Sequence, residues 1–92
     1  MSLKRTRTEH PADFILARVR QHAGFAASHE VAPDTTFAKL GLDSLDVTEL
    51  TLELEDDFEI DVSDGEIGEL ATVGDLIALI KRKLDAKAKE SA

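Results

Sequence analysis

The feature that most constrains the fold is a long stretch without helix breakers. After Asp43 the chain contains neither glycine nor proline until Gly65. Within this stretch, apolar residues recur at the spacing i, i+3, i+7 and i+11 of a single helical stripe, at Val47, Leu50, Leu54 and Phe58. Since aspartate is also among the best N-cap residues, the pattern predicts a helix over residues 44–58 with one buried stripe.

The same periodicity predicts two further long helices. Pro11 suits the first turn of a helix, because its missing N–H has no partner there anyway, and apolar spacing then predicts a helix over residues 11–23. Thr72 and Asp75 form a capping pair in front of a second periodic run. That run predicts a helix over residues 73–84.

Two segments between these helices lack such a pattern. Residues 25–43 form a connection too long to be held without side-chain anchors, and Phe37 and Leu40 are the apolar candidates for that role. Residues 65–70 include two glycines, each of which weakens a helix by about 1 kcal/mol. We therefore expect at most a short helical turn there.

The predicted fold is all-α: a small four-helix bundle with three longer helices, one short helix and a long loop between the first two. Residues 1–10 are expected to be a flexible basic leader and residues 86–92 a flexible tail. Residues 11–85 would form the single domain.

Size and composition narrow the classes of function. The chain has 92 residues, which allows one small core but makes a deep enclosed active site difficult to build. It contains no cysteine, which excludes disulfides and thiolate metal ligands. No apolar run approaches the length of roughly 20 residues that a membrane span requires. We expect a soluble, cytoplasmic monomer that works through its surface and does not bind a membrane.

Charge is segregated along the chain. The net charge is −8, with Lys and Arg gathered in the two ends and absent between Lys39 and Lys81. The acidic middle contains Asp43, Asp46, Glu49, Glu53, Glu55, Asp56, Asp57, Glu59, Asp61, Asp64, Glu66, Glu69 and Asp75. Such a segment repels phosphate backbones and attracts basic protein surfaces, so nucleic acid is not an expected partner.

The water-facing side of the predicted helix 44–58 is unusual. Leu45 and Leu52 project there seven residues apart, and they are flanked by Glu49, Glu53 and Asp56. Isolated exposed leucines and acidic runs are common on solvated faces. Together they fit a docking surface, in which apolar contact provides affinity and charge provides steering.

Ser44 lies at the start of this face, next to the N-cap. Free amides and the positive end of the helix dipole favour an anion there, so a phosphodiester on the serine oxygen would be well placed. Plain capping is the simpler explanation of an Asp-Ser pair in front of an apolar helix.

The residues around Ser44 carry a resemblance to a known family. The string Phe37-Ala38-Lys39-Leu40-Gly41-Leu42-Asp43-Ser44-Leu45-Asp46, with Glu49-Leu50 and the acidic run before Phe58, resembles the acyl carrier protein family. The similarity extends over residues 12–84, and the Leu-Gly-x-Asp-Ser-Leu core combines a tight turn, a cap and an exposed serine.

The resemblance implies a role for each residue of this face. A carrier-protein synthase (a phosphopantetheinyl transferase) would attach 4'-phosphopantetheine to Ser44, between Asp43 and Leu45. Acyl chains would ride as thioesters on the arm, and acyl-processing enzymes with basic patches would dock on Asp46, Glu49, Leu52, Glu53, Glu55 and Asp56. The carrier itself would supply no catalytic group, and its pathway (fatty-acid, lipid or polyketide-type synthesis) stays open.

Two chemical alternatives fit the sequence poorly. A Ser-His-Asp triad would need His10, His22 or His29, but all three lie well before Ser44 in the chain and no nucleophile elbow surrounds this serine. Calcium binding at residues 61–65 fails the EF-hand pattern, because apolar residues would occupy ligand positions. Loose binding of divalent ions to the acidic cluster stays open, but no specific metal site is predicted. An acidic interaction module without a prosthetic group explains the leucine face equally well and remains open.

The acidic middle should destabilise the folded chain by self-repulsion, and we expect crowding to raise carboxyl pKa values. Raising NaCl from about 10 mM to about 0.5 M should screen this repulsion and raise the thermal midpoint. A gain of about 1 kcal/mol corresponds to roughly 4–8 °C for a chain of this size. A midpoint that does not respond to salt would contradict this expectation.

Overall fold

The computed structural model describes residues 10–23 and 31–91, with side chains up to residue 89. The elements in chain order are α2 (Pro11–Ala23), the 3-10 turn η2 (Ala38–Leu40), α3 (Ser44–Phe58), α4 (Asp64–Gly68) and α5 (Val73–Ser91). These residues contain three long α-helices, one short α-helix and no strand, which confirms the predicted all-α fold. The leader 1–9 and residues 24–30 of the long loop lie outside the described residues.

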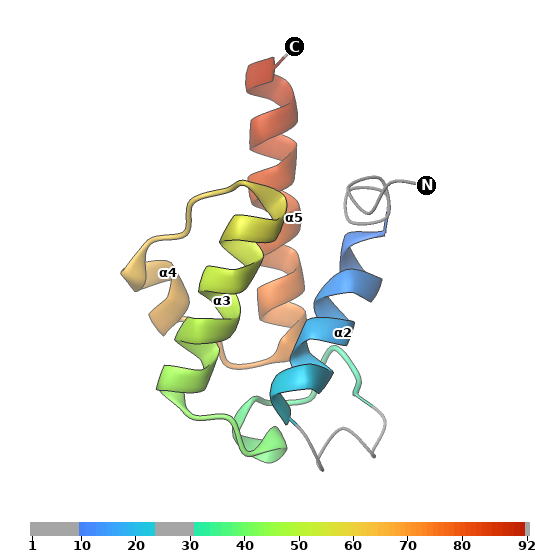
Figure 1. The fold of residues 1–92 in the computed structure, drawn as a ribbon, viewed down its shortest axis with the longest axis vertical. Helices are drawn as coiled ribbons and strands as arrows, with labels where there is room; N and C mark the ends of the chain where they lie inside the picture. Colours follow the sequence, from blue (N-terminus) through green and yellow to red (C-terminus); the bar gives the residue numbers. More distant parts are fainter. Residues whose placement is uncertain (1–9, 24–30, 92) are drawn as a thin grey trace.

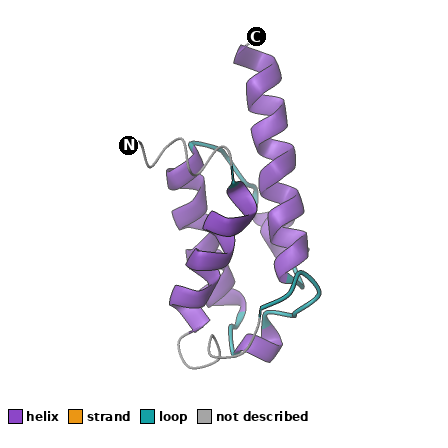
Figure 2. Ribbon diagram, turned by 90° about the vertical axis from the view of Figure 1, so that its right-hand side faces the viewer, coloured by secondary structure: helices purple, strands orange, loops and turns teal. Residues whose placement is uncertain are grey.

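The three long helices pack around a common core. Figures 1 and 2 show α2, α3 and α5 side by side, with α4 lying against α3 on the side away from α2. The predicted stripe of α3 faces the interior, and each of its four members is buried: Val47, Leu50, Leu54 and Phe58. Within the described residues no helix is both long and apolar enough to cross a membrane.

The long loop is anchored as predicted and also in a way that was not predicted. Phe37 and Leu40 are 3% and 5% exposed, and burial of such a side chain contributes about 1.5–3 kcal/mol. In addition, the Phe37 N–H donates to the Ala71 carbonyl at 3.0 Å, and the Val73 N–H donates to the Thr35 carbonyl at 2.9 Å. These hydrogen bonds connect the loop directly to the N-terminal end of α5.

Three helices begin with side-chain caps. Asp43 Oδ1 accepts from the Asp46 N–H at 2.9 Å, and Asp46 Oδ2 accepts from the Asp43 N–H at 3.1 Å, which makes a complete capping box for α3. Ser63 and Glu66 form the same box at α4. The predicted Thr72–Asp75 pair caps α5.

Two of the capping carboxylates have lowered pKa values. The Ser63 N–H, followed by Lys83 at 2.9 Å, lowers the pKa of Glu66 from 4.5 to about 2. The amide of Ala71, followed by that of Thr72, lowers the pKa of Asp75. The expectation that crowding raises carboxyl pKa values is wrong for these two residues, because amides stabilise their charged form.

α5 is longer than the helix predicted over residues 73–84, because it continues as far as Ser91 and takes in most of the predicted tail. Figures 1 and 2 both show α5 extending past the other helices. Lysine and alanine favour helix strongly, and Lys87 Nζ donates to the carbonyls of Phe58 and Glu59 at 3.2 and 3.0 Å. A cation at the carbonyl end of α3 also complements its dipole.

The close approach of the loop to α5 generates a stability prediction. A Cβ on Gly74 would lie 2.7 Å from the Pro33 carbonyl oxygen. This oxygen already accepts a hydrogen bond from the Gly74 N–H at 2.7 Å. Gly74→Ala should therefore lower the free energy of unfolding by about 1–3 kcal/mol, measured in urea. Gly68→Ala is the matched control, because its Cβ meets nothing within 4 Å and alanine gains up to about 1 kcal/mol in a helix. Equal effects of the two changes would contradict this account.

The cap of α4 generates a pH prediction. Because the folded pKa of Glu66 lies below its usual value, its charged form stabilises the fold above about pH 4.5 and loses this effect as the pH falls towards 2. The difference in unfolding free energy between wild type and Glu66→Gln should therefore be largest near pH 7 and shrink below about pH 4.5. Glu69→Gln, which removes a neighbouring exposed carboxylate, is the control for charge alone. A difference that stays constant with pH would contradict the assignment.

Candidate functional site

Ser44 is the first residue of α3 and is exposed. Its carbonyl oxygen accepts from Thr48 Oγ1 at 2.8 Å, whereas its own hydroxyl forms no hydrogen bond with any described residue. The capping box uses the amide of Asp46, so the amides of Ser44 and Leu45 in the same turn have no intrahelical acceptor. The hydroxyl is thus accessible and lies at the positive end of the α3 dipole.

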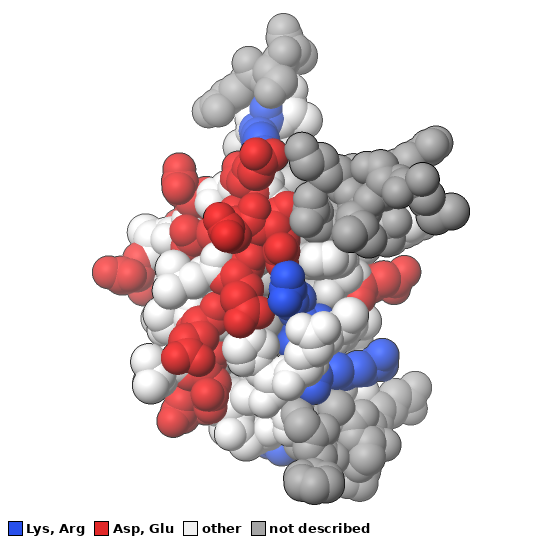
Figure 3. Space-filling model, in the orientation of Figure 1, with Lys and Arg blue, Asp and Glu red and all other residues white. Residues whose placement is uncertain are grey.

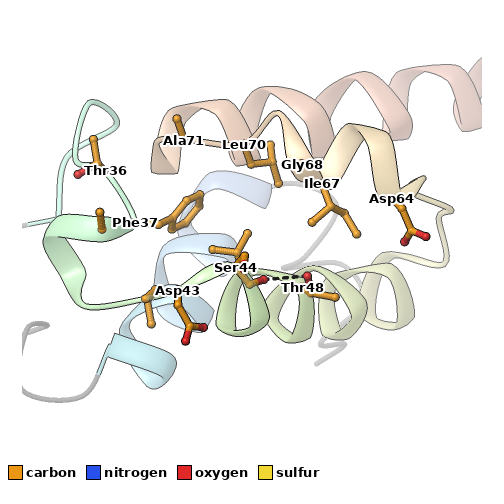
Figure 4. Close-up of a pocket in the computed structure, with 13 residues that line it drawn as sticks. Thr36, Phe37, Asp43, Ser44, Thr48, Asp64, Ile67, Gly68, Leu70 and Ala71 are labelled. Atoms are coloured by element: carbon orange, nitrogen blue, oxygen red, sulfur yellow. Dashed lines mark hydrogen bonds between the residues drawn. The ribbon is translucent and has the colours of Figure 1, made fainter.

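A cavity of about 590 Å³ opens beside this serine. Its walls come from the first turns of α3, from the loop around Phe37, and from α4 with the residues that follow it. Figure 4 shows Phe37, Ile67 and Leu70 pointing toward the start of α3, with Asp64 at the far end. The interior is mainly apolar, whereas Thr36, Thr48 and the two aspartates supply polar groups at its edges.

The water-facing ridge of α3, here called the crest, is formed by Leu45, Glu49, Leu52 and Asp56. Leu45 is 65% exposed and Leu52 is 54% exposed, and they are the exposed large apolar side chains among the described residues. Glu49 and Asp56 lie on the same crest and are exposed. Figure 3 shows the acidic side chains as a stripe that crosses this face of the molecule. The predicted combination of apolar and acidic groups is therefore present on one surface.

The other acids assigned to this face are less exposed than the sequence indicated. Asp46 is half-buried in the capping box, and Glu55 is half-buried along the helix. Glu53 is turned toward α2, where its carboxylate lies 3.0 Å from His22 Nε2 and 3.4 Å from Arg18 Nη1. The expectation that Glu53 faces water is only partly correct, because its side chain is 40% exposed.

Among the described residues, the groups that the rival chemistries would need do not meet at the cavity. None of the residues that line the cavity is a histidine, and His22 is engaged with Glu53. His10 immediately precedes α2, and His29 lies outside the described residues. In the described part of the chain, no three His, Cys, Asp or Glu side chains are grouped in a way that could hold a metal ion.

Sequence reasoning missed most of the cavity. Thr48, Ile67 and Leu70 were not assigned to the site, because their positions follow from how α4 and the long loop pack against α3. One sequence signal for the cavity is the predicted anchoring by Phe37, which places the loop near the serine. A second is the Ser-x-x-Glu pattern of Ser63 and Glu66, a capping box that marks the start of α4.

The residues present fit a phosphate ester on Ser44. The accessible hydroxyl offers an attachment atom, the free amides of the first turn favour an anion, and the cavity leaves space beside the attachment point. The carboxylate of the preceding residue, Asp43, accepts the Asp46 N–H in the capping box.

Comparison with known proteins agrees with this geometry. Residues 13–80 match the family described as phosphopantetheine attachment site. The crystal structure of an acyl carrier protein from Thermotoga maritima matches with a TM-score of 0.70 and 30% identity, covering 84% of this chain and 94% of that one. The solution structure of the acetyl actinorhodin acyl carrier protein from Streptomyces coelicolor has the same fold, with a TM-score of 0.71, 24% identity and coverage of 83% and 92%. The chain belongs to the acyl carrier protein family and contains its phosphopantetheine attachment domain.

Proposed function

We propose that this protein carries acyl intermediates on a 4'-phosphopantetheine arm attached to Ser44. The observation that carries the proposal is the exposed, unbonded hydroxyl at the start of α3, next to a cavity of about 590 Å³. When bound, the arm supplies a terminal thiol that holds acyl groups as thioesters. The pathway is of the fatty-acid, lipid or polyketide type, and the protein is a cytoplasmic monomer.

The protein's own residues position the arm and present it. Asp43 starts α3 and thereby fixes the direction in which Ser44 projects. Free first-turn amides stabilise the phosphate charge, since a helix N-terminus favours anions. The cavity would offer the proximal part of the arm, or a short acyl chain, a mainly apolar surface to lie against.

Partner enzymes dock on the crest of α3. Leu45 and Leu52 present apolar area that is costly to leave in water, and Glu49 and Asp56 attract basic side chains. Exposed charges of this kind act mainly on the association rate. The partners that fit are a phosphopantetheinyl transferase and acyl-processing enzymes whose docking patches combine Arg or Lys with an apolar pocket.

The test is covalent loading. Incubation with coenzyme A and a carrier-protein transferase of broad tolerance should add a single phosphopantetheine, measured by intact-protein mass spectrometry. Ser44→Ala should abolish the addition while changing the unfolding free energy by less than about 1 kcal/mol, because the side chain is exposed and unbonded. Ser63→Ala, which removes a capping serine elsewhere, should still be loaded.

Two outcomes would contradict the proposal. Loading of the Ser44→Ala variant would place the arm on another residue. Wild-type protein that stays unmodified would favour an acidic interaction module without a prosthetic group.

A further inference from the structure

The acidic residues of α3 fall into two groups, according to whether the protein itself supplies a cation to them. On the edge facing α2, Arg18 binds two carboxylates. Its Nε and Nη2 lie 2.9 and 2.7 Å from Asp57 Oδ2, and its Nη1 lies 3.4 Å from Glu53 Oε1. His22 Nε2 adds a contact to the second oxygen of Glu53 at 3.0 Å.

Arg18 is held firmly in this position. Its guanidinium lies 5.6 Å from the centre of the Phe14 ring, and that ring packs edge-on against Phe58 of the core at 5.4 Å. The Arg18 side chain is 29% exposed and that of Asp57 only 15%, so solvent screens this pair less than a fully exposed one. Arginine suits this position because its guanidinium group can donate to two carboxylates while its planar face packs near an aromatic ring.

The remaining acids have no such partner. Among the described residues, the side chains of Glu49, Glu55 and Asp56 form no ion pair, and that of Asp46 accepts from the Asp43 N–H. Glu49 and Asp56 lie on the crest with Leu45 and Leu52. Glu55 follows Thr48 by seven residues and therefore lies on the edge that faces the cavity and α4.

We propose that Arg18 is a specificity-determining residue that confines basic partners to the crest and the α4 edge of α3. It does so as an internal competitor, because it already occupies Glu53 and Asp57. This inference rests on the proposed function, in which the face beside Ser44 docks proteins with basic patches. It removes Glu53 from the primary docking set, although the resemblance placed it there.

The physical reason is competition between cations. A partner's Arg or Lys that approaches Glu53 must displace Arg18 or share the carboxylate with it, and it meets a like charge in either case. At Glu49 or Asp56 the same side chain meets an uncompensated carboxylate. Basic side chains of a partner are therefore attracted less to the α2 edge of α3 and more to the side where Ser44 borders the cavity.

A double-mutant cycle on the full chain tests this inference. The measured quantity is the second-order rate of phosphopantetheine loading by the broad-tolerance transferase at low ionic strength. Glu49→Gln should slow loading by about two- to fivefold, the range of a single exposed ion pair, whereas Glu53→Gln should slow it by less than about twofold. In an Arg18→Gln background the arginine no longer competes for Glu53, although His22 Nε2 still contacts it, so Glu53→Gln should then cost about two- to fivefold as well.

Arg18→Gln alone should accelerate loading, and the acceleration should disappear at high salt. Arg18→Lys is the matched control, because it keeps the charge but reaches both carboxylates less well, and its rate should lie between those of wild type and Arg18→Gln. Thermal melts of each variant separate a docking effect from loss of fold.

The possible results separate the two proposals. Equal slowing by Glu49→Gln and Glu53→Gln in the wild-type background would overturn the role of Arg18, while loading itself would still support the carrier function. An unchanged effect of Glu53→Gln after removal of Arg18 would also overturn it. Absence of loading in every version, wild type included, would overturn the carrier function and with it the docking inference.

Discussion

Burial of one stripe of α3 is the constraint on which the rest of the structure depends. Leu50 and Leu54 are fully buried in the core, and this fixes the rotation of α3 about its own axis. Once that rotation is set, each other position along the helix has a defined direction. Ser44 borders the cavity, Leu45 and Leu52 point to water, and the acids are divided between the crest and the two edges.

The acidity of the middle segment serves three structurally different purposes. Asp46, Glu66 and Asp75 accept hydrogen bonds from backbone amides and start helices, and two of them have lowered pKa values for that reason. Glu53 and Asp57 join α3 to α2 through Arg18. The acids of the crest have neither role and remain available for other molecules. A high density of negative charge is thus tolerated because much of it is matched within the fold.

The cavity beside Ser44 depends on contacts between segments that are distant in sequence. Backbone bonds from Thr35 and Phe37 to the start of α5 hold the loop in place, and the absence of a side chain on Gly74 allows that approach. The short helix α4 then closes the opposite wall. Because α4 has only five residues and two glycines, its placement relies on its caps and on burial of Ile67 more than on helix propensity.

The sequence alone determined the features that depend on local spacing. The bounds of α2 and α3, the buried stripe, the Asp43 cap and the exposed Leu45 all follow from a period of 3.6 residues and from capping chemistry. The tertiary structure decided the cavity, and it added a contact that supports the extension of α5, whose lysines and alanines already favour a helix. Lys87 binds the end of α3 from 28 or more positions away, and the cavity walls come from three separate segments.

The acidic face of α3 also combines a feature that local spacing determines with one that tertiary packing determines. Periodicity placed Glu49 and Glu53 on neighbouring positions of one surface, but it could not show that Arg18 stands beside only one of them. That difference arises from the packing of α2 against α3, which joins residues 35 positions apart. The local sequence pattern determines which side chains face away from the core. The packing of the helices determines which neighbour each of these side chains contacts.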